Sequence, residues 1–269
     1  MSRARTRPGD VILDLLRSAR GRRQSASSLI HSAALFGFSE NTVRVTLSRL
    51  MARGRIESPR RGEYRLSPGT DALNDFVERW RLGEDRVRPW QPGRWLFVHL
   101  TDADERSAWA LDALGFRCVL PGLHARPDNL ALDGDTLHRL ATRIGLSGRA
   151  RLIAGEPFGD TAAWLDAWAP EALNRDYRDG LARLSASSAR LDGLPAGEAK
   201  LECFRLGGEM IHRLAKDPLL PEPFADVAAR RALWRATVDY DRQGKELWAR
   251  ASHAELNRMP HPRLAATPP

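Results

Sequence analysis

The sequence predicts a multidomain α+β protein, and three observations carry this prediction. The chain has 269 residues, more than one compact domain usually holds. The strongly basic N-terminal region contains segments with helical periodicity and one short segment of alternating polarity. Strand-like and helix-like segments follow one another farther along the chain. The C-terminal part shows helical periodicity alone. We therefore expect an N-terminal domain over residues 1–70, a helical linker over 71–93 and a central domain over 94–157. A helical domain over residues 158–258 and a disordered tail over 259–269 complete the chain.

The charge of the chain is concentrated at its N-terminus. Residues 1–70 hold 14 arginines, no lysine and five acidic residues, a net charge of +9. The other 199 residues hold 28 basic and 29 acidic groups, a net charge of −1, so one segment accounts for the total of +8. Phosphate contacts dominate nucleic-acid affinity, and a basic segment of this kind favours a polyanionic partner.

Composition excludes several classes of protein. No apolar run approaches the roughly 20 residues that a membrane span needs, and the arginine-rich N-terminus lacks the apolar core of a secretory signal. The two cysteines, Cys118 and Cys203, lie far apart, which matches neither a disulfide framework nor a zinc site. We expect a cytoplasmic protein without a membrane, metal or cofactor partner.

Three short helices are predicted in the N-terminal domain, each beginning at a side chain suited to capping. Asp10, Ser25 and Ser39 are these caps, and apolar residues follow each at helical spacing. The third helix runs to about Arg53, and its apolar face comprises Val43, Leu47, Leu50 and Met51. The opposite face carries small, polar and basic side chains: Asn41, Arg44, Val45, Ser48, Arg49 and Ala52.

A short hairpin follows the third helix. Residues 55–58 and 63–66 alternate in polarity around a turn that contains Arg60 and Arg61. Three helices and a basic-tipped hairpin form the order of a winged helix-turn-helix, which places its third helix in the major groove. Winged helices also serve as protein-interaction modules, and this alternative stays open. The predicted DNA contacts are Ser39, Asn41, Thr42, Arg44, Val45, Ser48, Arg49, Arg60 and Arg61.

Four segments resemble one family. Residues 37–50 contain a Ser-Glu followed by Val-Arg and Ser-Arg-Leu, and Trp95-Leu96-Phe97-Val98, Gly115-Phe116 and Asp217-Pro218-Leu219-Leu220-Pro221 follow in order. This pattern resembles the PaaX-type family of bacterial transcriptional repressors. The resemblance implies a homodimer that binds double-stranded operator DNA at an inverted repeat. It also implies repression of aromatic-acid catabolism, typically phenylacetate degradation, and release by a coenzyme A thioester.

The central domain is predicted to be a ferredoxin-like βαββαβ unit. Strand-like and helix-like segments follow one another over residues 94–100, 104–114, 116–120, 123–126, 136–144 and 149–154. The region also resembles small ferredoxin-like CRISPR-associated nucleases, in which an aspartate after the first strand binds the metal. Asp102 and Asp104 occupy that place here, so a metal-dependent nuclease is the alternative function. Acidic residues before a helix are, however, ordinary caps, and we predict no catalytic residue or metal site.

The C-terminal region is predicted to be helical over residues 161–168, 170–189, 197–216 and 223–252. Trp164 and Trp168 lie four residues apart, a spacing typical of core or subunit-interface aromatics. The same residues are alternatively candidates for an aromatic effector pocket. A coenzyme A thioester needs an aromatic lining and cations for its phosphates. The predicted effector residues are Arg126, Trp164, Trp168 and Arg175.

Overall fold

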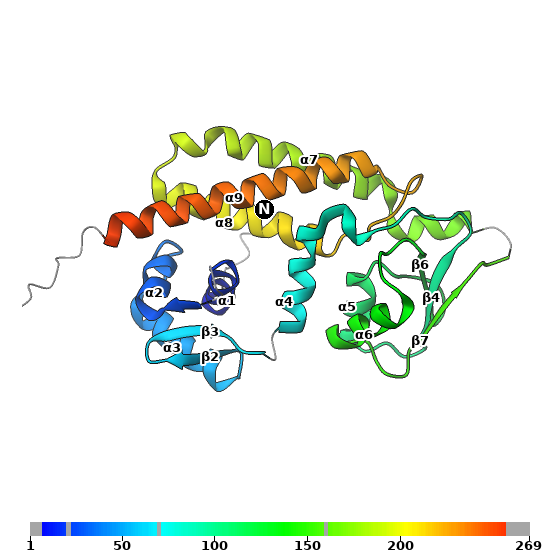
Figure 1. The fold of residues 1–269 in the computed structure, drawn as a ribbon, viewed down its shortest axis with the longest axis horizontal. Coiled ribbons are helices and arrows are strands. Elements are labelled where there is room, and N and C mark those ends of the chain that lie inside the picture. Colours follow the sequence, from blue (N-terminus) through cyan, green and yellow to red (C-terminus); the bar gives the residue numbers. More distant parts are fainter. Residues whose placement is uncertain (1–6, 20–22, 69–70, 159–160, 257–269) are drawn as a thin grey trace, which may run out of the picture.

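The computed structural model describes residues 7–19, 23–68, 71–158 and 161–256. It confirms a mixed α and β protein with two small antiparallel sheets. Figure 1 shows the N-terminal helices and hairpin at one end of an elongated molecule and the four-stranded sheet at the other. Long helices α7 (Pro170–Arg190), α8 (Ala196–Ala215) and α9 (Val227–Leu256) span the distance between them. The tail predicted for residues 259–269 lies outside the described residues.

The N-terminal elements pack around one apolar core. They are α1 (Pro8–Ser18), β1 (Arg23–Ser25), α2 (Ala26–Ala34), α3 (Glu40–Ala52), β2 (Ile56–Arg60) and β3 (Glu63–Leu66). The strands form an antiparallel sheet in the order β1-β3-β2. Leu16, Leu29 and Leu47 bring the three helices together, and Ile56 and Leu66 add the hairpin. The three predicted helices and the hairpin are therefore confirmed.

Three details of this region correct the sequence-based expectation. Helix α1 begins at Pro8 with no side-chain cap, so Asp10 lies in the first turn instead of capping the helix. Met51, expected on the buried face of α3, is 43% exposed because its side chain falls at the edge of the packed stripe. Strand β1 was not predicted, because three residues are too short to show alternation; its pairing with β3 defines it.

The central elements form a four-stranded antiparallel sheet in the order β5-β6-β4-β7. They are β4 (Trp95–His99), α5 (Glu105–Ala113), β5 (Arg117–Leu120), β6 (Leu123–Pro127), α6 (Gly134–Ile144) and β7 (Arg151–Gly155). Each lies within two residues of its predicted position. Leu96 and Val98 face α5 and α6, whereas Trp95 and Phe97 face the tryptophans that follow the sheet. Both faces of the central strand are therefore covered.

The expected linker is packed into the molecule. Helix α4 (Asp71–Glu78) continues into the 3-10 helix η3 (Arg79–Arg86), and Trp80 is fully buried against the long helices. Trp234 of α9 donates its indole N–H to the Trp80 carbonyl at 2.9 Å. Gly83 has φ of 51°, and a Cβ there would lie 2.5 Å from the Trp234 ring, so only glycine fits. This segment therefore packs directly against α9.

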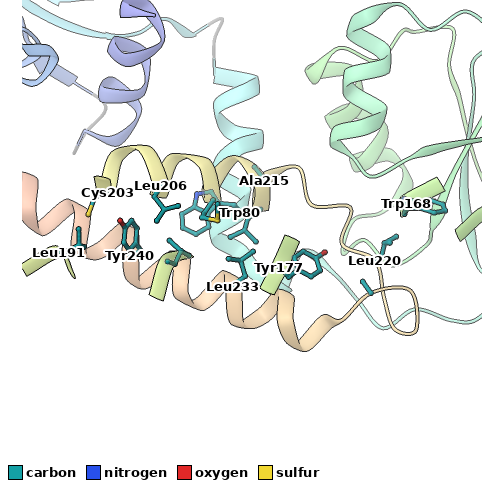
Figure 2. Close-up of a cluster of buried hydrophobic side chains, with 14 of the residues drawn as sticks. Trp80, Trp168, Tyr177, Leu191, Cys203, Leu206, Ala215, Leu220, Leu233 and Tyr240 are labelled. Carbon is teal, nitrogen blue, oxygen red and sulfur yellow. The ribbon is translucent and has the colours of Figure 1, made fainter. Parts of the chain in front are cut away.

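The C-terminal helices enclose the largest apolar core. Figure 2 shows Leu206 of α8 and Leu233 and Tyr240 of α9 pointing into a common cluster with Trp80. The segment Ala162–Trp168, η4, is a 3-10 helix, and α9 begins at Val227, four residues after the expected start. The Asp226 side chain accepts a bond from the Ala229 backbone N–H at 2.8 Å, which explains the later start of α9.

An aromatic contact joins the N-terminal module to the long helices. The ring of Phe36, in the turn between α2 and α3, meets that of Phe204 of α8 edge to face, with centroids 4.9 Å apart. Trp248 of α9 packs against the same N-terminal core. On the other side of the module, the Arg17 guanidinium of α1 donates to the Asn74 side chain of α4 at 2.6 Å. The module is thus held at two places, both outside the exposed face of α3.

Loss of this aromatic contact should weaken the whole protein measurably. We expect Phe204→Ala to lower the free energy of unfolding by about 1–2 kcal/mol, because a half-buried ring is removed and Phe36 and Trp248 lose its cover. Urea unfolding monitored by tryptophan fluorescence measures the change. Phe158→Ala is the matched control, since the Phe158 ring is fully exposed and its loss should change nothing. Equal stability of the two variants would show that the docking contact contributes little.

Candidate nucleic-acid interface

Helix α3 divides its side chains between the core and solvent as the sequence predicts. Val43, Leu47 and Leu50 are buried. The five predicted contact residues on the opposite face, Asn41, Arg44, Val45, Ser48 and Arg49, are all exposed. Val45 is 40% exposed, and an apolar side chain at such a place suits the methyl group of a thymine. The helix therefore offers polar, basic and small apolar groups together on one open face.

Ser39 and Thr42 shape the start of α3. The Ser39 hydroxyl accepts the Thr42 backbone N–H at 3.2 Å and lies 2.9 Å from the Thr42 hydroxyl. Ser39 is exposed and Thr42 half-buried, so both remain at the open end of the helix. The confirmed cap has a structural role, and the predicted DNA contacts of these two residues stay predictions.

The hairpin tip lies beside the beginning of α2. Gly62, with φ of 78°, allows the turn that follows Arg60 and Arg61, and its carbonyl accepts the Ala26 backbone N–H at 2.8 Å. An open groove of about 630 Å³ lies between α2, α3 and this turn, and Ser27, His31 and Arg44 contribute to its lining. Both tip arginines are exposed. The tip is thus held in a defined position next to the exposed face of α3.

Seven arginines of this module fall into two groups. Arg44 pairs with Glu40 at 2.7 Å, Arg23 lies 3.7 Å from Glu63, and Arg65 pairs with Glu57. Among the described residues, no carboxylate lies within 4.0 Å of the second group, which comprises Arg49, Arg53, Arg60 and Arg61. An arginine without an acidic neighbour gives up no ion pair when it binds a phosphate or a guanine. The pairing of Arg44 was not considered at the sequence level, although a spacing of four residues on a helix indicates it.

Two of the four predicted effector residues need correction. Arg126 is 1% exposed, and its guanidinium donates to the carbonyls of Leu114, Pro127 and Pro218 and to the Asn129 side chain. Burial lowers the pKa of Arg126 to about 9, and the backbone carbonyls occupy its donors. Trp168 is also buried, and its indole N–H donates to the Gly115 carbonyl at 2.9 Å. Neither side chain is accessible to a ligand in this conformation.

The other two predicted effector residues lie in different surroundings. Trp164 packs edge to face on Trp95 and Phe97, with centroids 5.5 and 6.1 Å apart, so it belongs to the aromatic cover of the sheet. Arg175 lies on α7, its side chain 63% exposed and 4.0 Å from Glu171. The structure therefore supports the core interpretation of the tryptophans and does not gather the four residues into one pocket.

The aspartates behind the nuclease alternative lie at the start of α5. Asp104 caps this helix, its Oδ1 accepting the Ser107 backbone N–H at 2.7 Å, and this bond holds the pKa of its carboxyl below the usual value. Over the part of the chain that the structure describes, no three His, Cys, Asp or Glu side chains lie close enough to hold a metal together. None of the described helices is long and apolar enough to cross a membrane.

Comparison with known proteins points to one family over the N-terminal module. Residues 9–69 match the family described as PaaX-like protein, which confirms the resemblance predicted from the sequence. A solved structure similar to this one is the uncharacterized protein Rv0674 from Mycobacterium tuberculosis, with a TM-score of 0.62 and 24% identity. The alignment covers 93% of this chain and 100% of that one, and at this identity it shows a shared fold alone. No curated protein matches the chain.

Proposed function

From the match of residues 9–69 to the PaaX-like family, we propose that the protein is a transcriptional repressor that binds double-stranded operator DNA. The N-terminal module is a winged helix whose α3 enters the major groove and whose hairpin tip contacts the backbone. One observation carries the proposal: the exposed face of α3 and the adjacent tip present arginines without acidic neighbours, within the segment that holds the positive charge. Base edges and phosphates are the groups that such a surface recognises.

The genes controlled are proposed to be those of aromatic-acid catabolism. The match to the PaaX-like family suggests that the protein regulates phenylacetic acid degradation. A small molecule such as an aryl coenzyme A thioester would release the protein from DNA. Release requires that the effector bind the DNA-incompetent state more tightly, and linkage then demands an equal weakening of effector binding to the operator complex. Calorimetry with phenylacetyl coenzyme A on free and DNA-bound protein measures both affinities.

A gel-shift assay with the DNA upstream of the protein's own gene tests the proposal. We expect a retarded complex that survives excess nonspecific duplex. Absence of specific binding would favour the alternative of a protein-interaction module. Metal-dependent cleavage has less support, because Asp104 caps α5 and no three His, Cys, Asp or Glu side chains of the described residues lie close enough to hold a metal.

The hairpin tip provides the first quantitative test. We expect Arg60→Ala/Arg61→Ala to weaken binding of all duplexes by the same factor, since phosphate contacts carry no sequence information. The slope of log K against log salt should become less negative by about 1.8, or about 0.9 per lost phosphate contact. Binding titrations at four salt concentrations measure the slope. An unchanged slope would show that the tip faces away from DNA.

The oligomeric state provides the second test. One winged helix offers few base contacts, and we propose that two copies bind an inverted repeat on one face of the duplex. Light scattering should return a mass about twice the chain's 30.0 kDa, and half-site centres should lie about 34–36 Å apart or a multiple of this. A 30.0 kDa species that binds the operator as a monomer would contradict the dimer.

A further inference from the structure

A carboxylate lies within the surface proposed for DNA, at the start of α3. Glu40 is the first residue of α3, and its side chain is 59% exposed. One of its carboxylate oxygens, Oε1, lies 2.8 Å from Nε and 2.7 Å from Nη2 of Arg44, one helical turn farther along. Both residues line the open groove between α2, α3 and the hairpin turn. The Glu40–Arg44 pair is therefore preformed and open to solvent on the recognition face.

Glu40 opposes binding to DNA in general. Its charge repels phosphate, and its bonds to Arg44 neutralise one of the two arginines on the exposed face of α3. An exposed ion pair of this kind stabilises a helix only slightly, so its contribution to stability does not explain why the pair is present. Arg49, on the same face, has no carboxylate within 4.0 Å among the described residues. The helix thus presents one arginine with no described carboxylate beside it and one that is paired with an acid.

A carboxylate that lowers general affinity can raise specificity. A protein discriminates between sequences by what it rejects as well as by what it accepts. In the major groove a carboxylate accepts from the N4 amino group of cytosine, and an arginine donates two bonds to O6 and N7 of guanine. On DNA without a cytosine in reach, Glu40 has no new donor, and Arg44 stays paired with it. On DNA that offers a cytosine and a guanine in reach, Glu40 can accept from the cytosine and Arg44 can donate to the guanine.

We infer that Glu40 is a specificity-determining residue and that the Glu40–Arg44 pair recognises neighbouring G·C base pairs. This inference rests on the proposed function. Four residues of helix rise about 6 Å, which spans one or two base steps of about 3.4 Å. Glu40 therefore accepts from a cytosine while Arg44 donates to a guanine within two base pairs of it. The operator positions under the first turn of α3 are accordingly G·C pairs.

The variant Glu40→Gln tests this directly, because it keeps the shape of the side chain and removes its charge. Dissociation constants are measured for the operator, for operators with one G·C pair at a time changed to A·T, and for a nonspecific duplex. We expect Glu40→Gln to bind the nonspecific duplex several-fold more tightly. The ratio of specific to nonspecific affinity should fall about tenfold, and the preference at one G·C position should weaken, because the glutamine oxygen is a poorer acceptor than the carboxylate.

Glu57→Gln is the matched control, since Glu57 also pairs with an arginine, Arg65, but lies on the hairpin. It should shift the affinity for all duplexes together and leave every base preference intact. Thermal melts check that both variants fold. Neither substitution changes Ser39, whose hydroxyl caps α3.

Two outcomes of these titrations would overturn the inference. One is an unchanged base preference with an unchanged specificity ratio in Glu40→Gln. The other is a uniform gain in affinity for every duplex, which would make Glu40 a general electrostatic brake. Wild-type protein that binds its operator specifically keeps the proposed function in either case. Wild-type protein that binds no duplex would instead overturn both proposals.

Discussion

Replacing Arg49 with alanine is expected to weaken operator binding by about 1–3 kcal/mol, a factor of roughly five to 150. Arg49 is exposed on the face of α3 opposite Val43 and Leu47, and no described carboxylate lies within 4.0 Å of it. Its guanidinium is therefore available to donate two parallel bonds to one guanine, and alanine removes both. Fluorescence anisotropy with a labelled operator measures the loss.

The pattern across sequences distinguishes a base contact from a phosphate contact. If Arg49 recognises a guanine, Arg49→Ala should tolerate any base at that position and keep its other preferences. Arg175→Ala is the matched control, because Arg175 is equally a surface arginine but lies on α7, outside the N-terminal module. Wild-type operator affinity in folded Arg49→Ala would remove Arg49 from the proposed interface, and the same result for Arg44→Ala as well would remove α3.

The largest expected effect on stability belongs to Arg126. We expect Arg126→Ala to lower the free energy of unfolding by about 3–5 kcal/mol, since it leaves a cavity and several buried carbonyls without donors. The Pro218 carbonyl accepts from Arg126 Nη2 at 3.2 Å, and the Leu114 carbonyl accepts from Nη1. Asn129, which itself bonds to Arg126, donates to the Leu219 carbonyl at 2.7 Å. Removing Arg126 therefore takes away one of the bonds that tie the Asp217–Leu220 segment to the four-stranded sheet, while the bond from Asn129 to Leu219 remains.

Urea unfolding of Arg126→Ala and Arg126→Lys separates charge from geometry. Lysine keeps the charge but lacks the planar guanidinium that donates to all of these acceptors at once. Arg126→Lys should therefore recover only part of the lost free energy of unfolding. Arg230 of α9 donates to the Leu220 carbonyl at 2.7 Å and remains in both variants, holding the other end of the segment. Wild-type stability of Arg126→Ala would show that water replaces the guanidinium at little cost.

The sequence alone determined the local structure of this protein. Apolar spacing identified the buried face of α3, and Ser25, Ser39 and Asp104 marked helix starts that the structure confirms. Alternation located the hairpin, and strand-like apolar segments located the strands of the central sheet. These features were predictable because each depends on residues within a few positions of one another, such as a cap and the N–H three residues later. The exposed site residues Asn41, Arg44 and Arg49 follow from the same periodicity.

The tertiary structure decided which side chains are reachable. Arg126 looked like a cation for a ligand phosphate, yet carbonyls brought from Leu114 and Pro218, 12 and 92 residues away, enclose it. Trp168 looked like a pocket wall, but the Gly115 carbonyl accepts its N–H and the sheet covers its ring. The docking of Phe36 on Phe204 likewise joins residues far apart in the chain. Periodicity shows that a face is apolar or basic, whereas its burial depends on the element that packs against it, and only the assembled fold supplies that partner.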